Sequence, residues 1–393
     1  MLALCLLAAI GPLTVDLYLP ALPALARDLR VGATTAQLTV TAATIGIAIG
    51  QLVMGHWSDT AGRRLPLLAS TAVHIAASVV VALAPSIEVA LGGRFLQGLG
   101  SAGGAVVATA MVRDLFDGLP FVRVMAKIAL VGGLSPVAAP FLGAQLMHWA
   151  DWRGLFGVVA CYGALAVVVA AITLRETLPR ERRLSIRWPA LASRYREIFT
   201  DRVYVGVAIV GGLMVSGVFA TITTGAFLLQ GRYGLSPDGY ALVVGLYAIA
   251  FAFGTQASAR VIRRFGPGTV LTAAVPTMAA AGFAIAPAAA IAGLAGLAAA
   301  TSVFMLAAGA TGPCSGVLAL QRHGRHAGTA AAVLGAANFG MAGLASPLVG
   351  WLGVDSPVPV SLVIGAAETA ALAALLLLVR PALRPAASEN GDA

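Results

Sequence analysis

A single acidic residue interrupts the apolar stretch at the start of the chain. Residues 1–23 carry no charged side chain other than Asp16, and about 20 apolar residues suffice for a helix to cross a bilayer. A carboxylate inside such a helix is costly and normally faces a cavity or a partner. We expect Asp16 to bind and release a proton. The alternatives are a structural acid paired permanently with one donor, and a secretory signal peptide, although no basic residue precedes the apolar run.

One basic side chain also falls inside an apolar run. Arg94 cannot lose its proton, so it must pair or face water. We expect a fixed positive charge that tunes the Asp16 carboxylate or orders a chain of water molecules. The alternative is an arginine near a helix end whose head group reaches the membrane interface. Tyr18 and Gln97 are predicted to hydrogen-bond nearby and to face a substrate cavity. Further polar side chains predicted for that cavity are Gln51, Gln145, Gln256 and Asn338.

Other reactive residue types are sparse. Glu368 is a second carboxylate in an apolar run, interpreted as a second proton site, a group for a cationic ligand, or a lipid-facing residue. His74 is expected to be a packed, hydrogen-bonded histidine. The three cysteines form no CxxC pair, so we predict no metal and no redox site. Lys127, the only lysine, follows Ala126, so the chain has no Gly-Lys of a nucleotide-binding P-loop. No cofactor is predicted.

The elements that carry these residues must be membrane-spanning helices. The chain is 59% hydrophobic and 10% charged, whereas soluble proteins carry about 25% charged residues. Apolar runs of about 20 residues predict twelve spans. They cover residues 1–23, 36–55, 65–85, 89–111, 122–147, 154–174, 203–230, 237–258, 268–287, 290–316, 327–351 and 359–379. The predicted fold class is therefore an all-α membrane protein.

The basic residues predict the orientation of these spans. With the N-terminus inside, the inner loops and tail hold 20 of the 25 Arg and Lys residues and the outer loops hold 4. Basic residues accumulate in cytoplasmic loops, so both termini are predicted to be cytoplasmic. The net charge of +9 follows from this distribution. It gives no reason to expect a nucleic-acid partner.

A basic segment divides the chain into two halves of six spans. We predict an N-terminal half at 1–174, a cytoplasmic linker at 175–202, a C-terminal half at 203–380 and a cytoplasmic tail at 381–393. Within the linker, Trp188, Leu191 and Tyr195 recur at helical spacing, which favours a short helix on the membrane surface over a disordered loop. The PxxG pattern of residues 140–143 returns at 347–350 in the matching span. Repeated halves are typical of transporters, with the substrate between them.

A cytoplasmic turn follows the second predicted span. We interpret it as a latch that stabilises the outward-open state, because Asp59 can cap a helix N-terminus and the arginines can pair across the halves. Arg113 is the predicted partner of Asp59. Plain anchoring of the membrane orientation is the alternative. The predicted latch residues are Gly55, Asp59, Gly62, Arg63, Arg64 and Arg113.

The fifth predicted span is crowded with glycine and proline. Proline removes a helical hydrogen bond and bends the helix, so we expect a bend that seals the halves against proton leak. Loose packing chosen for residue size alone is the alternative. The residues concerned are Gly132, Gly133, Pro136, Pro140 and Gly143.

Several of these motifs resemble one transporter family. Residues 55–64 (GHWSDTAGRR) resemble the signature loop of the major facilitator superfamily, residues 94–100 (RFLQGLG) its proton-driven RxxQGxG motif, and residues 134–143 its antiporter motif. Residues 16–23 (DLYLPALP) are similar to the opening of the Bcr/CflA branch of drug:proton antiporters. Segments 113–114, 152–156, 175–179 and 327–330 also fit that branch. Thr60 and Cys314 depart from the usual pattern.

The resemblance implies the major facilitator fold, with twelve helices in two six-helix halves, and a transporter that is not an enzyme. It implies export of chloramphenicol- or bicyclomycin-like drugs in exchange for protons, by a monomer in the cytoplasmic membrane. The residues alone support only an amphipathic small molecule between two halves. A proton-coupled transporter of a sugar, amino acid or small peptide stays open as the alternative. A receptor without transport activity is disfavoured because the chain has no long loops.

Overall fold

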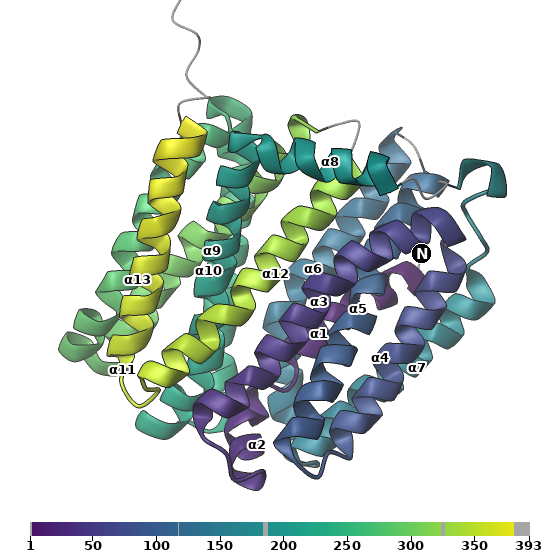
Figure 1. Cartoon of the computed structure of the whole chain (residues 1–393). Coiled ribbons are helices and arrows are strands. Elements are labelled where there is room, and N and C mark those ends of the chain that lie inside the picture. The colour runs from purple at the N-terminus through teal and green to yellow at the C-terminus, as the bar shows by residue number, and fades with distance from the viewer. Residues whose placement is uncertain (1, 117, 184–187, 324–326, 381–393) are drawn as a thin grey trace, which may run out of the picture.

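The fold is a bundle of long helices (Figure 1). The computed structural model describes residues 2–116, 118–183, 188–323 and 327–380, and none of these residues forms a strand. The elements are α1 (Leu2–Asp16), η1 (Leu19–Ala21), α2 (Leu22–Asp28), α3 (Ala33–Ala61), α4 (Arg64–Ala82), α5 (Ile87–Leu115), α6 (Gly118–Leu146), α7 (Trp152–Thr173), η2 (Arg180–Arg182), α8 (Trp188–Thr200), α9 (Arg202–Phe227), η3 (Leu228–Arg232), α10 (Pro237–Phe265), α11 (Pro267–Gln321), α12 (Ala327–Leu352), α13 (Pro357–Ala374) and η5 (Leu375–Val379).

The first predicted span is not one straight helix. α1 ends at Asp16, and the chain then continues through a turn, η1 and α2. Pro20 and Pro23 occupy the first turns of η1 and α2. Because proline has no amide hydrogen and disfavours helical geometry in the residue before it, the helix is interrupted directly after Asp16.

α11 contains the ninth and tenth predicted spans. At 55 residues it is far longer than a bilayer requires. Its backbone leaves helical geometry at Ala292 and at Gly293, where φ is +54°. This positive φ suits glycine, which lacks a Cβ. The break divides α11 into two arms and reconciles a single assigned helix with two predicted spans.

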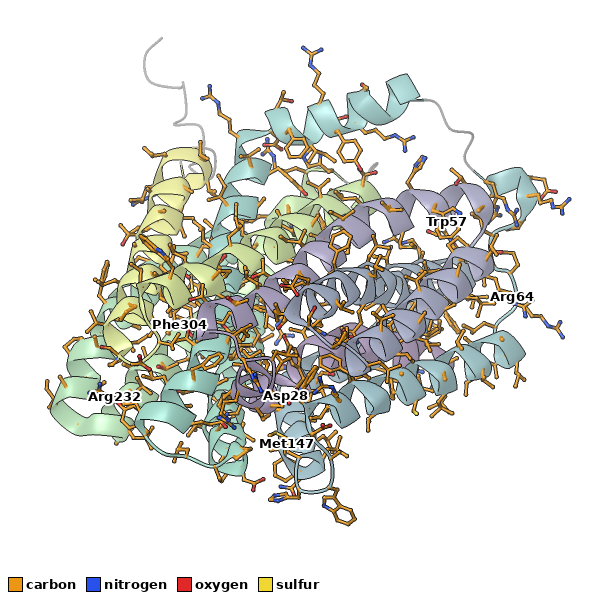
Figure 2. The ribbon with its side chains drawn as sticks, turned by 60° about the horizontal axis from the view of Figure 1, so that its bottom comes forward. Asp28, Trp57, Arg64, Met147, Arg232 and Phe304 are labelled. Carbon is orange, nitrogen blue, oxygen red and sulfur yellow. The ribbon has the colours of Figure 1, made fainter. Side chains whose placement is uncertain are left out.

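Ten helices in the described part of the chain are long and apolar enough to cross a membrane. Counting the two arms of α11 separately and adding α6, which occupies the fifth predicted span, yields the twelve predicted helices. α8 instead lies across one end of the bundle (Figure 1). We call this end the α8 face, and the end that contains α2 the opposite face. Arg64 lies at the first and Asp28 at the second (Figure 2).

The spanning helices form two halves of six. In the first half, α3, α4 and α1 pack on α5, and α7 packs on α4; in the second, α10 and α13 pack on α11, and α9 packs on α12. The halves meet along α3 with α12 and along α6 with α10. α8 is helical, as the linker pattern predicts, and its Ile198 is buried.

Glycines set the close approach of α3 to α5. A Cβ added at Gly98 would lie 2.0 Å from the carbonyl oxygen of Ala43, and one added at Gly46 would lie 2.2 Å from that of Phe95. Small residues let membrane helices approach closely, which substitutes for the hydrophobic driving force that lipid removes.

We expect Gly98→Val to prevent this packing, because the backbone of α3 cannot yield as a flexible side chain would. The loss of stability should reach about 3 kcal/mol or more, as in overpacked cores. Gly92→Val is the matched control on the same helix, since nothing lies within 4 Å of a Cβ there. Size-exclusion profiles of detergent-solubilised protein measure the effect. A monodisperse Gly98→Val protein as stable as the control contradicts the prediction.

Candidate proton and substrate site

Asp16 lies at the break after α1 and is buried, with 7% of its surface exposed. Among the described residues we find no hydrogen bond or ion pair to its carboxylate. Leu17, the residue after Asp16, packs against α6, since a Cβ added at Gly143 would lie 1.8 Å from the Leu17 carbonyl oxygen. η1, which begins three residues after Asp16, packs against α10 of the second half. The acid is therefore placed where α1, α6 and the second half meet.

Arg94 is fully buried, so its head group does not reach the membrane interface. Its Nη1 donates to the Thr14 carbonyl at 2.8 Å and to Gln97 Oε1 at 2.5 Å, and its Nε donates to the Thr39 carbonyl at 3.2 Å. The guanidinium lies 4.3 Å from the centre of the Tyr18 ring, a cation–π arrangement. Arg94 thus joins α5 to α3 and to the last turn of α1, two residues before Asp16.

The contacts of Arg94 continue into α4. Gln97 Nε2 donates to Ser78 Oγ at 2.7 Å, and the Ser78 hydroxyl donates to the His74 carbonyl at 2.7 Å. His74 Nδ1 lies 3.2 Å from the Gln97 carbonyl, and its side chain is fully buried, which confirms a packed, hydrogen-bonded histidine. Tyr18 Oη lies 2.9 Å from Thr39 Oγ1. Tyr18 and Gln97 are therefore buried parts of this network and do not line the cavity described next.

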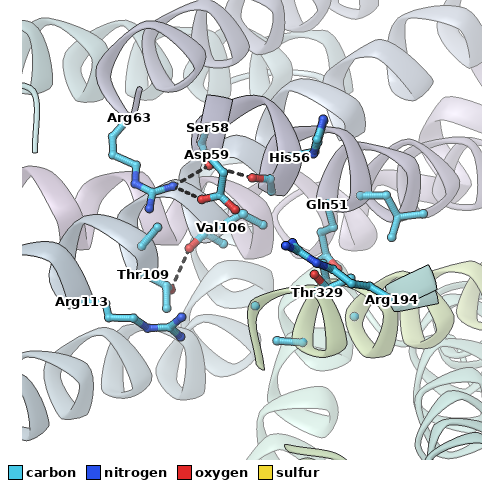
Figure 3. A pocket seen from close by; sticks show the side chains of 18 of the residues that line it. Gln51, His56, Ser58, Asp59, Arg63, Val106, Thr109, Arg113, Arg194 and Thr329 are labelled. Atoms are coloured by element: carbon cyan, nitrogen blue, oxygen red, sulfur yellow. Dashed lines mark hydrogen bonds and ion pairs between the residues drawn. The ribbon is translucent and has the colours of Figure 1, made fainter. Parts of the chain in front are cut away.

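A cavity of about 320 Å³ opens at the α8 face. α3, α5, α8 and α12 supply its walls, so it lies between the halves (Figure 3). Three basic side chains and Asp59 line it together with small apolar residues. Gln51, predicted to face the substrate cavity, lines it. Four residues predicted to form the latch also line it, namely Gly55, Asp59, Arg63 and Arg113.

The structure adds cavity residues that sequence analysis missed. Arg194 and Tyr195 of α8, and Thr329 and Gly335 of α12, also line it. Their sequence signal is weak, because an arginine on an interfacial helix is indistinguishable from an anchoring residue. The other predicted cavity residues lie elsewhere. Gln145 is at the opposite face and Gln256 is exposed on α10, while the buried Asn338 Oδ1 lies beside Gly211 without a partner.

The predicted pairing of Asp59 with Arg113 is wrong for this conformation. Asp59 Oδ1 pairs with Arg63 Nη1 at 2.5 Å, and Arg63 Nε pairs with Asp114 at 2.8 Å. Burial alone would lower the pKa of Arg63. The two negatively charged carboxylates accept hydrogen bonds from its guanidinium and stabilise the charged form, so the pKa is held above its ordinary value. Arg113 is exposed and points into the cavity region. The cluster therefore ties α3 to α5 within one half.

Glu176 fixes the turn between α3 and α4. Its carboxylate accepts hydrogen bonds from the backbone amides of Arg63 at 2.8 Å and Arg64 at 3.2 Å, and also from those of Thr177 and Leu178. Burial alone would raise the pKa of Glu176, but the four amide donors hold it below its ordinary value. Gly62 beside it has φ +98°, a conformation that suits glycine.

We expect acid to weaken the fold through Glu176. Because its folded-state pKa lies below the unfolded value of 4.5, its contribution is fully present above that pH and is lost as the pH falls through the lowered pKa. Glu176→Gln should lose about 1 kcal/mol near neutral pH, allowing for solvent screening, and should flatten the acid dependence. Thermal unfolding in detergent measures both. The exposed Glu181→Gln is the control, and an unaltered acid profile in Glu176→Gln argues against this role.

Hydrogen bonds join the halves at the opposite face. Asp238 of α10 accepts from Gln145 Nε2 at 2.8 Å and lies 2.9 Å from His148 Nε2, both near the end of α6. Gln230 Nε2 donates to the Pro20 carbonyl at 3.0 Å. The cavity is at the α8 face and these bonds are at the other. The structure is therefore closed at the opposite face and open at the α8 face.

The predicted antiporter motif is only partly placed. Pro140 and Gly143 of α6 are buried, and Gly143 fits against the chain break after Asp16, as described above. The surroundings of Gly132, Gly133 and Pro136 lie outside what the structure describes. No group of three His, Cys, Asp or Glu side chains in the described ranges is placed to hold a metal ion.

Comparison with known proteins identifies the family. Residues 4–347 match the Major Facilitator Superfamily. An uncharacterised MFS-type transporter of Bacillus subtilis, YdgK, is 33% identical over 88% of this chain and 87% of its own length. The chain belongs to the major facilitator superfamily. It is therefore a multi-pass membrane transporter of small molecules and not an enzyme.

Other members of the superfamily extend the comparison. A bicyclomycin resistance protein homolog of Haemophilus influenzae is 26% identical over 93% of this chain and 92% of its own length. A chloramphenicol resistance protein of Pseudomonas aeruginosa is 32% identical over 68% of this chain and 62% of its own length. Among solved structures, the nucleoside transporter NupG matches with a TM-score of 0.76 at 12% identity, covering 96% of this chain and 99% of NupG. The human organic anion transporter MFSD10 matches with a TM-score of 0.66 at 20% identity, covering 96% and 98%. These two likenesses confirm the fold.

Proposed function

We propose that this chain exports antibiotic-like amphipathic small molecules across the cytoplasmic membrane in exchange for protons. The observation that carries the proposal is Asp16, a buried carboxylate at the junction of the halves that has no hydrogen bond or ion pair to any described residue. A carboxylate in that position is costly while charged and gains from taking up a proton. The resistance proteins of Haemophilus and Pseudomonas support a drug as the exported molecule.

The orientation follows the distribution of basic residues. Arg63, Arg64, Arg113 and Arg194 lie on elements that reach the α8 face, and basic residues accumulate at the cytoplasmic side. We place the α8 face and both termini in the cytoplasm. The drug would then enter the cavity from the cytoplasm and leave at the opposite face. Segments 1–174 and 203–380 would move as two bodies joined by the linker 175–202. A cytoplasmic tail at 381–393 would follow the second body. A single chain would suffice for transport.

Inverted membrane vesicles test this proposal directly. An inward-acid pH difference should drive the uptake of chloramphenicol or bicyclomycin, and an uncoupler should abolish it. Equal uptake with the gradient collapsed would refute proton exchange. If neither drug moves but a sugar, an amino acid or a small peptide exchanges, the substrate is a metabolite.

Locking the opposite face should stop transport. We expect a short crosslinker between His148→Cys and Asp238→Cys, made in a chain without its native cysteines, to hold the halves in the present conformation. Drug should still bind from the α8 face, but uptake into vesicles should fall to background and recover when a cleavable crosslinker is cut. Crosslinked protein that transports at the uncrosslinked rate would contradict alternating access at this face. Each single cysteine variant is the control.

A further inference from the structure

Glu368 is isolated in the middle of the second half. It is the only charged residue of α13 and η5, which together run from residue 357 to 379, and it lies eleven residues from either end. At 1.5 Å per residue, this places it about 17 Å from each end of the span. Its side chain is fully buried, and neither carboxyl oxygen has a hydrogen-bond partner among the described residues. Glu368 is therefore not lipid-facing.

The surroundings of this acid are apolar. Gly217 of α9 provides the space for its carboxyl group, since a Cβ there would lie 3.0 Å from Glu368 Oε1, and the Phe304 ring of α11 contacts the same glycine. α9 carries one charged residue, Arg202, at its first position, about 22 Å along the helix from Gly217. α11 and α12 carry no charged residue. The other titratable groups on these helices are Tyr204 near the start of α9 and Cys314 ten residues after Phe304.

An ionised carboxylate in this position would have no compensating partner. A buried, unpaired charge costs several kcal/mol even after the protein relaxes, whereas a protonated carboxyl group loses far less on burial. No cation, amide or hydroxyl group reaches the oxygen atoms in the part of the chain that the structure describes. The group is therefore neutral in this conformation and holds a proton.

A small cavity lies about one helical turn along α9 and α11 from Gly217 and Phe304, the residues beside this acid. It has a volume of about 20 Å³, enough for one water molecule. Four of the residues that line it carry a hydroxyl group, namely Thr221, Thr224, Tyr247 and Thr301, and the others are apolar. Thr221 also donates a hydrogen bond of 2.8 Å to the carbonyl of Gly217, the residue that faces the acid.

The cavity lies on one side of Glu368 along α9, α11 and α13. Thr221 is four residues after Gly217 on α9, Thr301 is three residues before Phe304 on α11, and Val360 is eight residues before Glu368 on α13. Each of these steps leads toward the opposite face. The cavity thus provides hydroxyl groups and room for water between that face and the acid.

We propose that Glu368 is a second proton-binding site, in the second half of the transporter and separate from Asp16. A proton from the opposite face passes through the hydroxyl-lined cavity by way of water and forms the carboxyl O–H bond. The conformation described here, open at the α8 face, still holds that proton; the same O–H bond then breaks, and the proton leaves to water on the α8 side. This inference rests on the proposed exchange of drug for protons and adds a second carrier to it.

Infrared spectroscopy tests whether Glu368 holds a proton. Purified wild-type protein is prepared with glutamate enriched in a heavy carbon isotope, so that glutamate bands shift and aspartate bands do not. At neutral pH we expect a carbonyl band of a protonated carboxylic acid that shifts with the label. The band should disappear in Glu368→Gln and remain in Asp16→Asn and in the exposed-acid control Glu88→Gln. A wild-type spectrum without a glutamate-dependent band overturns the proposal, even if Glu368→Gln fails to fold.

Counting protons separates this inference from the proposed function. In proteoliposomes, drug-driven proton movement per transported molecule should be halved by Glu368→Gln and unchanged by Glu88→Gln. An unchanged ratio in Glu368→Gln overturns the second site while leaving drug–proton exchange in place. If wild-type protein moves no protons with the drug, the exchange mechanism fails, and with it the role of Glu368 as a carrier.

Discussion

Asp16→Asn will lower drug uptake driven by a pH difference at least about tenfold while leaving the protein folded in the membrane. Each unit of pH difference stores about 1.4 kcal/mol per exchanged proton, enough for a tenfold drug concentration ratio. Asparagine is nearly the same size but takes up no proton, so the energy of the proton that Asp16 carries is no longer coupled to the drug. Uptake into inverted vesicles under an imposed gradient measures the loss, which should be at least about tenfold.

The matched control is Asp151→Asn. Asp151 caps α7 by accepting from the Gly154 amide at 3.0 Å, and asparagine caps a helix about as well as aspartate. Drug binding measured in detergent distinguishes lost coupling from lost affinity. Full gradient-driven uptake by Asp16→Asn would remove the proton role from this residue and with it the basis of the proposed exchange.

Arg94→Lys should destabilise the first half strongly, although the charge is kept. The guanidinium bonds three acceptors on three elements, α1, α3 and α5, and an ammonium group cannot reproduce that fork. Hydrogen bonds to charged groups contribute about 1.5–3 kcal/mol each, so the loss of two should cost about 3 kcal/mol or more. Thermal unfolding in detergent and vesicle uptake should both show the defect.

Arg153→Lys is the comparison on the opposite face. Arg153 is partly exposed and pairs with Asp28, and such pairs contribute about 1 kcal/mol or less. If Arg94→Lys were as stable and active as Arg153→Lys, the three buried hydrogen bonds would have no structural role.

The sequence alone determined the fold class, an all-α membrane protein, the number of spans and the candidate functional residues such as Asp16. These features are local. Apolar runs, prolines and the charges in each loop follow from contiguous residues, so the twelve helices, the helical conformation of α8 and the unusual position of Asp16 could be predicted. Even the break after Asp16 has a local cause in Pro20 and Pro23, although our span of residues 1–23 did not include it.

Tertiary structure alone decided which groups meet. Arg94 bonds the carbonyls of Thr14 and Thr39, 80 and 55 residues earlier in the chain. Arg63 pairs with both Asp59 and Asp114, whereas Arg113 was the predicted partner of Asp59. Glu368 became informative only when packing left it without a hydrogen-bond partner in the described part of the chain. Hydrophobic patterns specify which face of a helix is buried but not which helix covers it. The partners of a buried polar group therefore depend on how the helices pack, which no single segment encodes.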